Sequence, residues 1–466
     1  MPFRPAGSIA SILDTPVAFG YSSFRESVMQ IDLNEYLLNN IMKTKSLKLL
    51  ACLVLIHGSV CAENGWPMFR GPQGNGAVSG SHIPLTWSET QNVLWKTAIP
   101  DLGWSTPVVQ DNRIWLTSAT KKGEDFFVFC VDAKSGRILI QKQLFHSDTP
   151  ERLGNSVNCY ASPSPAIEQG KVYLHFGSYG TACLDATTGN LIWKRDDLKC
   201  RHYRGPGSSP ILYQDLLVLT FDGVDLQYLI ALDKRTGKTI WKTDRTIEWK
   251  DLDKNGQPKR DGDFRKGFTT PLVIAVGGKE QLISPASSTL FAYEPATGKE
   301  IWRIRNTAHT PAVSPIFANG LVLAVTGHGA SEMLAIRPDG QNDVTDSHVA
   351  WRFAGKDVPQ TPSPVALNGL LYMISDNGKL NCIEVETGKV LWRESIGGNQ
   401  IASPIHDGER IYFFSLSGKT TVIRAGRTFE KLAENHLESG FLASPAVAGD
   451  ALILRTKTHL YRIEDK

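Results

Sequence analysis

One short phrase recurs along this chain and ends each time in tryptophan. A small residue is followed two positions later by Asp or Glu, then by Thr-Gly, and the Trp stands four residues after the glycine. Full copies occupy residues 183–193, 231–241, 292–302 and 382–392, and weaker copies occupy residues 130–140, where Ile140 replaces the Trp, and 335–351. A unit repeated this often predicts an array of equivalent supersecondary modules.

A second repeat, out of phase with the first, sets the number of modules. It consists of Ser or Thr, then Pro, then apolar residues, and its prolines are Pro107, Pro165, Pro210, Pro271, Pro315, Pro364, Pro404 and Pro445. The eight copies are spaced 40 to 61 residues apart. Each module reads as four short antiparallel strands, A to D, with the Thr-Gly hairpin between C and D. Four-stranded units in series at this spacing are typical of β-propeller blades.

The two ends of the chain predict how the ring closes. After Pro445 only three strands follow, at residues 446–447, 451–454 and 459–463, whereas a spare Trp strand at residues 93–99 precedes the first module. Pairing the two ends completes the last blade and removes two exposed sheet edges. We therefore predict an all-β protein, an eight-bladed propeller of four-stranded antiparallel blades closed by an N-terminal strand in the last blade.

The segment before residue 93 carries an export signature. Residues 42–48 are basic, residues 49–56 are apolar and residues 60–62 are small, which is the order of a secretory signal peptide too short to span a bilayer. We predict an upstream extension at 1–41 outside the fold, a signal peptide at 42–62, an N-terminal arm at 63–92 and the propeller at 93–466. The alternative is a genuine N-terminal extension with an internal anchor. We expect a monomer in the periplasm or cell envelope, without a transmembrane segment in the mature chain.

The tryptophan phrase resembles the docking repeat of the quinoprotein-type, or pyrroloquinoline quinone (PQQ)-like, β-propellers. The resemblance covers nearly everything from Val93 onward, and the size is closest to the outer-membrane assembly lipoprotein propellers. Residues 66–72 also resemble the start of uncharacterised envelope propellers. The resemblance implies a non-catalytic ligand- or protein-binding scaffold in the envelope, for which no cofactor is expected. The alternatives are a PQQ- and Ca²⁺-dependent dehydrogenase, whose members are longer, and a glycan-acting propeller enzyme. Fold likeness alone does not choose between them.

The net charge and the tryptophan positions bear on which ligands and cofactors are expected. A formal net charge of +3 over 466 residues gives no electrostatic case for nucleic-acid binding. An indole buries a large area and its N–H needs a partner, so the tryptophans of the phrase are predicted to dock blade against blade rather than to stack on a cofactor. These structural tryptophans are Trp95, Trp193, Trp241, Trp302, Trp351 and Trp392.

The connections from strand D to the next strand A converge on one end of the central channel. They supply aromatic, amide and cationic groups, which suit a polar or anionic ligand or a peptide segment. The alternative is a solvated loop surface without a ligand. The candidate binding residues at this mouth are Trp104, Tyr160, Arg201, His202, Tyr203, Arg204, Arg265, Lys266, His309, Gln360, Asn399 and Gln400.

Two further features are candidates for covalent or metal sites. Asp251, Asp253 and Asn255 alternate before a glycine, like the first half of a Ca²⁺ loop, although a plain polar hairpin explains them as well. Cys159 and Cys200 both lead into strand A of neighbouring blades, so a disulfide between them is one candidate. Cys183–Cys200 is the competing pairing, because sequence does not settle connectivity. Cys130, Cys183 and Cys382 fit small buried positions on strand C.

Overall fold

The computed structural model describes residues 65–78, 80, 82–154 and 157–465. The predicted upstream extension and signal peptide, residues 1–62, lie outside these described residues. Within them, no helix is long and apolar enough to cross a membrane.

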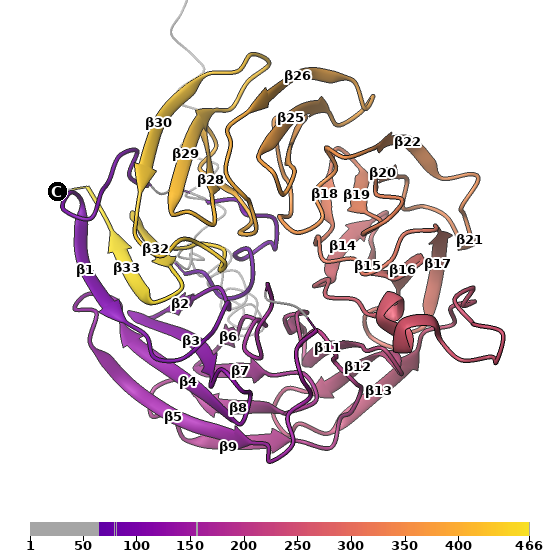
Figure 1. Cartoon of the computed structure of the whole chain (residues 1–466), viewed down its shortest axis with the longest axis horizontal. Coiled ribbons are helices and arrows are strands. Elements are labelled where there is room, and N and C mark those ends of the chain that lie inside the picture. Colours follow the sequence, from indigo (N-terminus) through magenta and orange to yellow (C-terminus); the bar gives the residue numbers. More distant parts are fainter. Residues whose placement is uncertain (1–64, 79, 81, 155–156, 466) are drawn as a thin grey trace, which may run out of the picture. The chain divides into compact units, whose positions relative to one another are not determined.

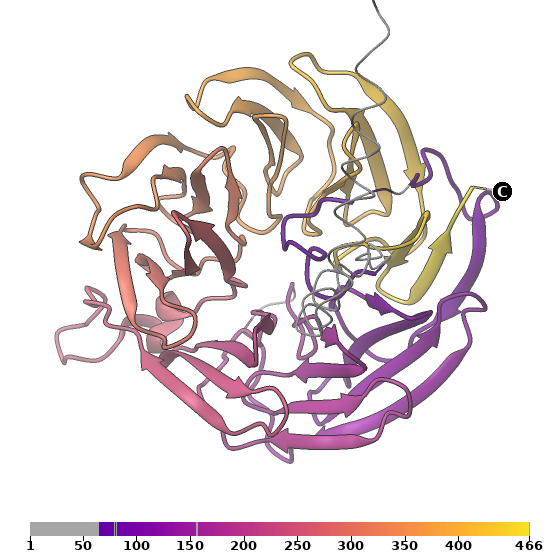
Figure 2. The same ribbon diagram turned by 180° about the vertical axis from the view of Figure 1, so that it is seen from behind.

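In the described part of the chain, eight small sheets stand in a ring, one per copy of the proline repeat (Figures 1 and 2). Blade 1 contains β2 (Val108–Gln110), β3 (Arg113–Ala119), β4 (Asp125–Asp132) and β5 (Ile138–His146). Blade 2 contains β6 (Ala166–Glu168), β7 (Lys171–His175), β8 (Thr181–Asp185) and β9 (Leu191–Arg195). Blade 3 contains β10 (Ile211–Tyr213), β11 (Leu216–Asp222), β12 (Gln227–Asp233) and β13 (Thr239–Asp244).

The next blades repeat this order. Blade 4 contains β14 (Leu272–Val276), β15 (Lys279–Ala286), β16 (Thr289–Tyr293) and β17 (Glu300–Arg305). Blade 5 contains β18 (Ile316–Ala318), β19 (Leu321–Val325), β20 (Glu332–Ile336) and β22 (Val349–Ala354). Blade 6 contains β23 (Val365–Leu367), β24 (Leu370–Ile374), β25 (Lys379–Glu384) and β26 (Val390–Ser395). Blade 7 contains β27 (Ile405–His406), β28 (Arg410–Phe414), β29 (Lys419–Arg424) and β30 (Lys431–His436).

Blade 8 joins the two ends of the propeller. It contains β31 (Ala446–Ala448), β32 (Ala451–Arg455) and β33 (His459–Ile463), and its outer strand is β1 (Val93–Ala98). β1 runs antiparallel to β33, with Val93 opposite Ile463 and Ala98 opposite His459. The predicted eight-bladed propeller and its closure by the N-terminal strand are therefore confirmed.

Blade 4 departs from the four-stranded pattern. A fifth strand, β21 (Asn342–Asp343), pairs in parallel with β17. It comes from the insertion between strands C and D of blade 5, which crosses the seam and places the Asp343 carboxylate 2.7 Å from Arg305 Nε. The sequence showed this insertion as a delayed Trp351 but gave no sign that it would join the neighbouring sheet.

The Thr-Gly hairpins of blades 2, 3, 4 and 6 share one local interaction, in which the Thr hydroxyl donates to the Asp or Glu three residues before it. In blade 2, Asp185 Oδ1 accepts hydrogen bonds from the backbone N–H of Thr188 at 2.7 Å and from its hydroxyl at 2.8 Å, and these bonds lower the pKa of Asp185. Gly189 follows with φ of +70°. Glycine adopts that conformation without the steric cost of a Cβ, which explains its fixed place in the Asp-x-x-Thr-Gly spacing.

Tryptophans dock six of the eight blades onto the next. Trp193 Nε1 donates to the carbonyl of Lys234 at 2.9 Å, and the indole covers Gly237 so closely that a Cβ there would lie 2.7 Å from it. The equivalent indole bonds are Trp95 to Ala133, Trp241 to Pro295, Trp351 to Val385 and Trp392 to Gly426, at 2.8 to 3.2 Å. The glycine of the phrase therefore has two functions, since it permits the turn and leaves room for the neighbouring indole.

Trp302 reaches the next blade indirectly. Its Nε1 donates to Gln281 Oε1 at 2.8 Å, and Gln281 Nε2 donates to the Pro338 carbonyl at 2.7 Å. Pro338 occupies the position in blade 5 that Lys234 occupies in blade 3. Gln281 thus relays the contact where the blade 5 insertion changes the turn.

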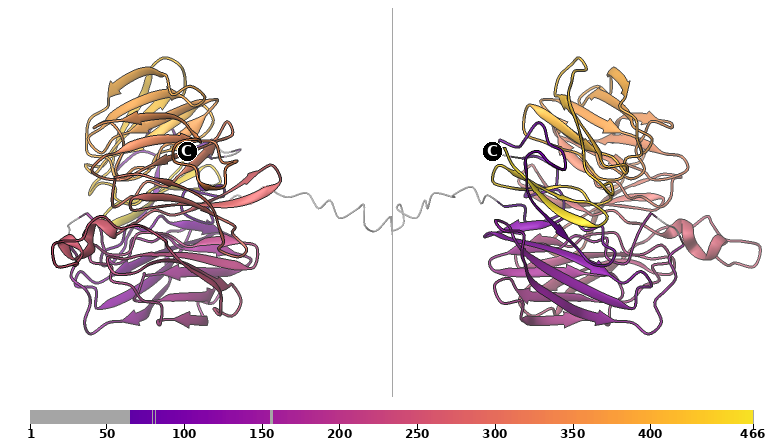
Figure 3. Two further views of the ribbon diagram at one scale, coloured as in Figure 1. Left: turned by 90° about the vertical axis from the view of Figure 1, so that its right-hand side faces the viewer. Right: turned by 60° about the vertical axis from the view of Figure 1, so that its left-hand side comes forward.

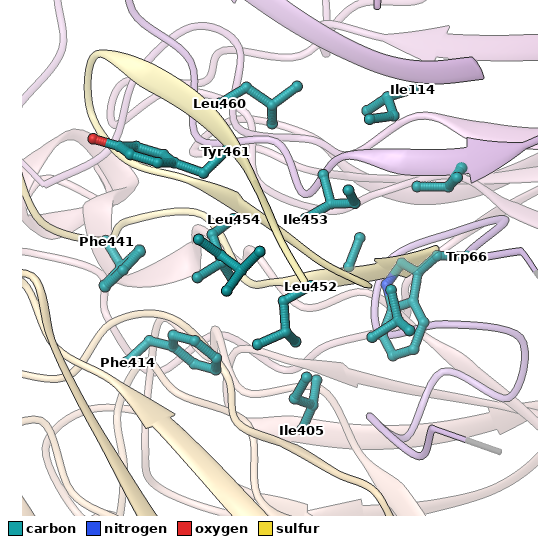
Figure 4. Packing of buried hydrophobic residues seen from close by; sticks show 14 of the residues in the cluster. Trp66, Ile114, Ile405, Phe414, Phe441, Leu452, Ile453, Leu454, Leu460 and Tyr461 are labelled. Atoms are coloured by element: carbon teal, nitrogen blue, oxygen red, sulfur yellow. The ribbon is translucent and has the colours of Figure 1, made fainter. Parts of the chain in front are cut away.

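The hydrophobic core lies between the blades rather than at the centre of the ring. Separate clusters of buried side chains fill the seams, for example between blades 1 and 2, 2 and 3, and 4 and 5. The largest cluster joins blades 7, 8 and 1 and includes Trp66 of the N-terminal arm (Figure 4). Burial at the seams makes stability depend on ring closure.

The connection between blades 3 and 4 is the longest D-to-A segment. It contains η1 (Lys259–Arg265), a 3₁₀ turn in which Arg260, Asp261 and Gly262 have φ of 51°, 54° and 80°. Figure 3 shows η1 and the hairpin before it standing out from one face of the ring. The left-handed backbone turns the following residues back toward the channel.

Candidate functional site

A cavity of about 480 Å³ occupies the channel at the end where the D-to-A connections meet. The B-to-C loops of blades 5 and 6 also reach it through His328 and Asp376. Its apolar lining comes chiefly from Phe69, Trp104, Phe264, Phe268, Ile401 and Leu442. A largely apolar hollow with a few polar groups is the usual form of a ligand site.

A ring of hydroxyl groups surrounds this cavity. They belong to the Ser or Thr that precedes each repeat proline. Six of the eight accept a hydrogen bond from the backbone N–H of the equivalent residue in the preceding blade. These links run from Thr106 to Ser164, Ser164 to Ser209, Ser209 to Thr270, Ser314 to Ser363, Ser363 to Ser403 and Ser403 to Ser444, at 2.9 to 3.0 Å. The repeated Ser/Thr-Pro motif therefore ties neighbouring blades together around the channel.

The ring is interrupted at two junctions. Ser314 Oγ and Thr106 Oγ1 are buried, and neither has a hydrogen-bond partner among the described residues. These hydroxyls would receive the links from blade 4 to blade 5 and from blade 8 to blade 1. The second junction is where the chain ends meet.

The N-terminal arm crosses the channel, and Figures 1 and 2 show it as an indigo segment inside the ring. Trp66 exchanges backbone hydrogen bonds with Val109 of blade 1 at 2.8 and 2.9 Å, and the Pro67 carbonyl accepts from Ile167 of blade 2 at 2.8 Å. Farther along, Val78 N–H donates to the His406 carbonyl of blade 7 at 2.8 Å. Because Phe69 of this arm lines the cavity, the arm forms its floor.

Arg70 fixes the arm from inside the protein. Its guanidinium is buried, and Nη2 donates to the carbonyls of Pro364 at 2.5 Å and Asn75 at 2.8 Å. Burial lowers the pKa of Arg70 to about 9. Two carbonyl acceptors from the arm and from blade 6 therefore hold this cation where it anchors the crossing.

The charged groups at the mouth are largely paired within the protein. Arg204 forms a two-pronged ion pair with Asp263, whose second bond is 2.6 Å. Asp376 accepts hydrogen bonds from the Thr361 hydroxyl at 2.5 Å and the Gln360 backbone N–H at 2.6 Å. Such pairing fixes the shape of the mouth and leaves little free carboxylate for acid–base work.

Two histidines form one side of the cavity. His309 and His328 exchange backbone hydrogen bonds at 3.0 and 2.7 Å, and their rings stack with centroids 6.2 Å apart. Phe264 lies 4.3 Å from the His309 ring. Burial lowers the pKa of both imidazoles, and for His309 the proximity of His328 lowers it further. At neutral pH this wall is therefore an uncharged aromatic surface.

The predicted mouth residues separate into two groups. Trp104, Arg204 and His309 line the cavity. Tyr160 is buried and donates to the Glu151 carbonyl at 2.9 Å, Arg201 pairs with Glu151, and the Tyr203 ring covers Gly154. Arg265 pairs with Asp251, and Gln360 donates its backbone N–H to Asp376. The Asn399 carbonyl accepts a hydrogen bond from the Leu416 N–H, and buried Gln400 donates to the Gly397 carbonyl.

His202 and Lys266 lie behind the channel wall. Lys266 Nζ donates to His202 Nδ1 at 3.0 Å and to the Asp222 carbonyl at 3.1 Å. The Asp222 carboxylate in turn holds Arg245 at 2.7 and 2.9 Å in a buried ion pair. Burial lowers the pKa of both Lys266 and His202. This network joins blades 3 and 4 and is oriented away from the cavity lining.

Several cavity residues were not predicted from the sequence. Phe69, Arg260, Phe268, His328 and Asp376 line the site but were not among the candidates. The Ser/Thr hydroxyls were used only to count modules. The available signal was their position directly before strand A, which is the innermost strand of every blade.

The acidic hairpin has partners within the protein. Asp251 pairs with Arg265 Nη2 at 2.7 Å, and Asp253 Oδ1 accepts from the backbone N–H groups of Asn255 and Gln257 at 2.8 and 2.9 Å. Across the described residues, no three His, Cys, Asp or Glu side chains are grouped to hold a metal ion.

The proposed Cys159–Cys200 disulfide is not formed, because the structure records both residues as free thiols. Cys159 lies in the cluster between blades 1 and 2, whereas Cys200 lies between blades 2 and 3, with its Sγ 3.4 Å from His202 Nε2. The competing partner, Cys183, is also a free thiol. Cys130, Cys183 and Cys382 are fully buried on strand C.

The repeated indole docking and the closed ring define the chain as a PQQ-like β-propeller. It belongs to the family described as outer membrane protein assembly factor BamB, whose profile matches residues 83–243 and 225–466. A relative of that name from Shewanella oneidensis is 23% identical over 326 residues, covering 65% of this chain and 74% of the relative. Another, from Moranella endobia, is 22% identical over 375 residues, covering 75% and 82%.

The fold extends to enzymes. The solved structure of quinohemoprotein alcohol dehydrogenase from Comamonas testosteroni matches with a TM-score of 0.63 and 13% identity, over 86% of this chain and 81% of that one. At this identity the match describes the fold alone.

Proposed function

We propose that the protein is a non-catalytic scaffold of the cell envelope, exported by its N-terminal signal, that binds a partner protein segment or a polar or anionic ligand at the mouth. The main support is that ionisable groups at the mouth form ion pairs within the protein, as Arg204 does with Asp263. The cavity offers shape, hydroxyls and aromatic walls rather than an activated acid, base or nucleophile. Its membership of the BamB-described family supports an envelope protein partner.

The dehydrogenase alternative requires PQQ and Ca²⁺ in the same cavity. PQQ is a planar tricarboxylic acid, and Ca²⁺ takes six to eight oxygen ligands. The lining cations are Arg204, which is already neutralised by Asp263, and Arg260, which stands 4.9 Å over the Phe264 ring. The lining carboxylates, Asp263 and Asp376, are also occupied. These residues fit the pair poorly, and we derive no reaction through it.

Site-specific cross-linking in cells tests the scaffold proposal. A photoreactive residue in place of Trp104 at the mouth should capture a partner, whereas one in place of Ile240, exposed on the outer strand of blade 3, should not. Arg260→Glu should reduce capture if the recognised group is anionic, and Lys254→Glu in the same insertion is the matched control. PQQ- and Ca²⁺-dependent dye reduction by the purified protein would instead favour the dehydrogenase.

A further inference from the structure

The arm uses one repeated backbone position to bind the inner strands of the blades. Val109, Ile167 and His406 each stand two residues after the repeat proline of their blade. Val109 and His406 both donate and accept backbone hydrogen bonds with the arm, and Ile167 donates one. The inner edge of strand A is therefore a docking edge for extended polypeptide, and the chain's own arm already occupies it in three blades.

The equivalent positions of blades 3 and 4 are Leu212 and Val273. Tyr213 of β10 and Leu216 of β11 flank a two-residue turn and form a hydrogen-bonded pair. The next pair, Leu212 opposite Leu217, is therefore a non-hydrogen-bonded one. The N–H and C=O of Leu212 point away from β11 and into the channel, as those of Val109 do. The same alternation along β14, counted back from Val276 opposite Lys279, turns the backbone of Val273 inward.

These two positions line a second cavity of about 320 Å³ at the arm end of the channel. The arm bounds it through Met68, Phe69 and Gly74. The remaining lining is mainly apolar and includes Ile211 of β10 and Leu272 of β14. The space is thus the gap that remains where the arm passes blades 3 and 4.

The cavity has one charged side chain at its rim. Glu280 is solvent-exposed and lines the cavity, and Tyr213 donates its hydroxyl proton to Glu280 Oε2 at 2.6 Å. Burial raises the pKa of Tyr213 to about 12, so the phenol remains a donor. No ion pair of Glu280 occurs among the described residues, and a cationic group is the complement that this carboxylate lacks.

We propose that this cavity binds an extended segment of a partner polypeptide carrying a Lys or Arg, whose backbone pairs with Leu212 and Val273 and whose cation pairs with Glu280. Pairing of a peptide with a free strand edge is an established mode of recognition, in which backbone bonds give affinity and flanking pockets select side chains. The binding continues, on blades 3 and 4, the contacts that the arm makes on blades 1 and 2. It does not depend on the ligand at the mouth.

Fluorescence anisotropy with a defined probe tests the site. The probe is a labelled, end-blocked hexapeptide of alternating Val and Thr with one central Lys, titrated with the full chain. Glu280→Gln should weaken binding roughly tenfold, whereas Glu386→Gln, in the exposed hairpin of blade 6, should leave it unchanged. A backbone-methylated form of the probe, which has lost N–H donors, should bind weakly to the unmodified protein and to Glu280→Gln. The proposal would be overturned if the probe did not bind, or if neither Glu280→Gln nor methylation of the probe weakened binding.

Photo-crosslinking identifies the occupant. A benzoyl-phenylalanine in place of Leu272 should label the hexapeptide, and unlabelled peptide should compete. Cross-links to a second copy, or to upstream residues of the same chain, would mean that the site serves self-association or the chain's own segment and would refute the partner proposal.

Discussion

At the seams, Trp193 and Trp241 behave alike in successive blades, since each indole donates to a carbonyl of the next hairpin and covers its glycine. At the mouth, successive blades contribute different groups from equivalent connections, with Arg204 before blade 3, Asp263 and Phe264 before blade 4 and His309 before blade 5. The repeated positions therefore hold the ring, and the positions that escape repetition form the site. Damage to the seams should reduce stability, whereas damage to the mouth should reduce binding.

The largest expected effect comes from removing the closing strand. A protein that begins at Leu102 lacks β1 and the arm, so β33 has an open edge and the cluster of blades 7, 8 and 1 loses Trp66. We expect it to lose cooperative unfolding and to aggregate. Urea unfolding followed by circular dichroism, with size-exclusion chromatography, measures both. Melting like the full chain would show that the seams hold without closure.

Tryptophan truncation compares the two regions directly. Trp193→Ala or Trp302→Ala should cost ~3–5 kcal/mol of unfolding free energy, because each empties a buried aromatic site. Trp104→Ala, at the mouth, should cost much less. Denaturant midpoints in the reverse order would exchange the roles of seam and mouth.

Acid should also destabilise the seams, because His175 is buried between blades 2 and 3 with its ring centroid 5.3 Å from that of Phe221. Burial lowers the pKa of His175 to about 3. Below pH 6.5 this imidazole is therefore protonated in the unfolded chain but stays neutral in the folded chain. Stability is then full above pH 6.5 and falls by about 1.4 kcal/mol per pH unit as the pH drops toward the folded value. His175→Phe should flatten this dependence in urea titrations at pH 7 and 5. An unchanged slope would assign the acid sensitivity to other groups.

A glycine pair isolates the clash with the indole. Gly237 and Gly170 have similar φ, of 71° and 73°, but a Cβ at Gly237 meets Trp193 at 2.7 Å while one at Gly170 meets nothing within 4 Å. We expect Gly170→Ala to cost about 1 kcal/mol from backbone strain and Gly237→Ala about 2–4 kcal/mol. Thermal denaturation of the two variants gives the difference, and equal losses would remove the packing role of the glycine.

The smallest effect tests the hydroxyl ring. Ser363 Oγ accepts from the Ser314 backbone at 3.0 Å, whereas Ser314 Oγ has no partner among the described residues. Ser363→Ala should therefore cost about 1–2 kcal/mol, and Ser314→Ala close to nothing. Chemical unfolding of both variants measures the two losses. A larger loss for Ser314→Ala would contradict the stabilising role of the hydroxyl ring.

The sequence predicted the ring well because the ring is repetitive. The indoles, hairpin glycines and spare strand at Val93 all follow from periodic positions. The mouth followed less well, since side-chain direction in a loop depends on backbone angles that no local pattern sets. The left-handed turn at Arg260 to Gly262 brings Asp263 and Phe264 to the cavity, whereas Arg265 and Lys266, chosen from the sequence, lie elsewhere. The floor was missed for the same reason, because the arm has no period to reveal its path.

Closure by the first strand also fixes the order of folding events. A chain that emerges with its N-terminus first presents β1 long before β33 exists, so the strand must wait, with an unsatisfied edge, for nearly the entire chain to follow. Contacts between such distant segments form slowly, and waiting edges invite mispairing. Blade 8 can therefore form only after synthesis is complete, because only then can β1 pair with β33 and the cluster around Trp66 of the arm be completed.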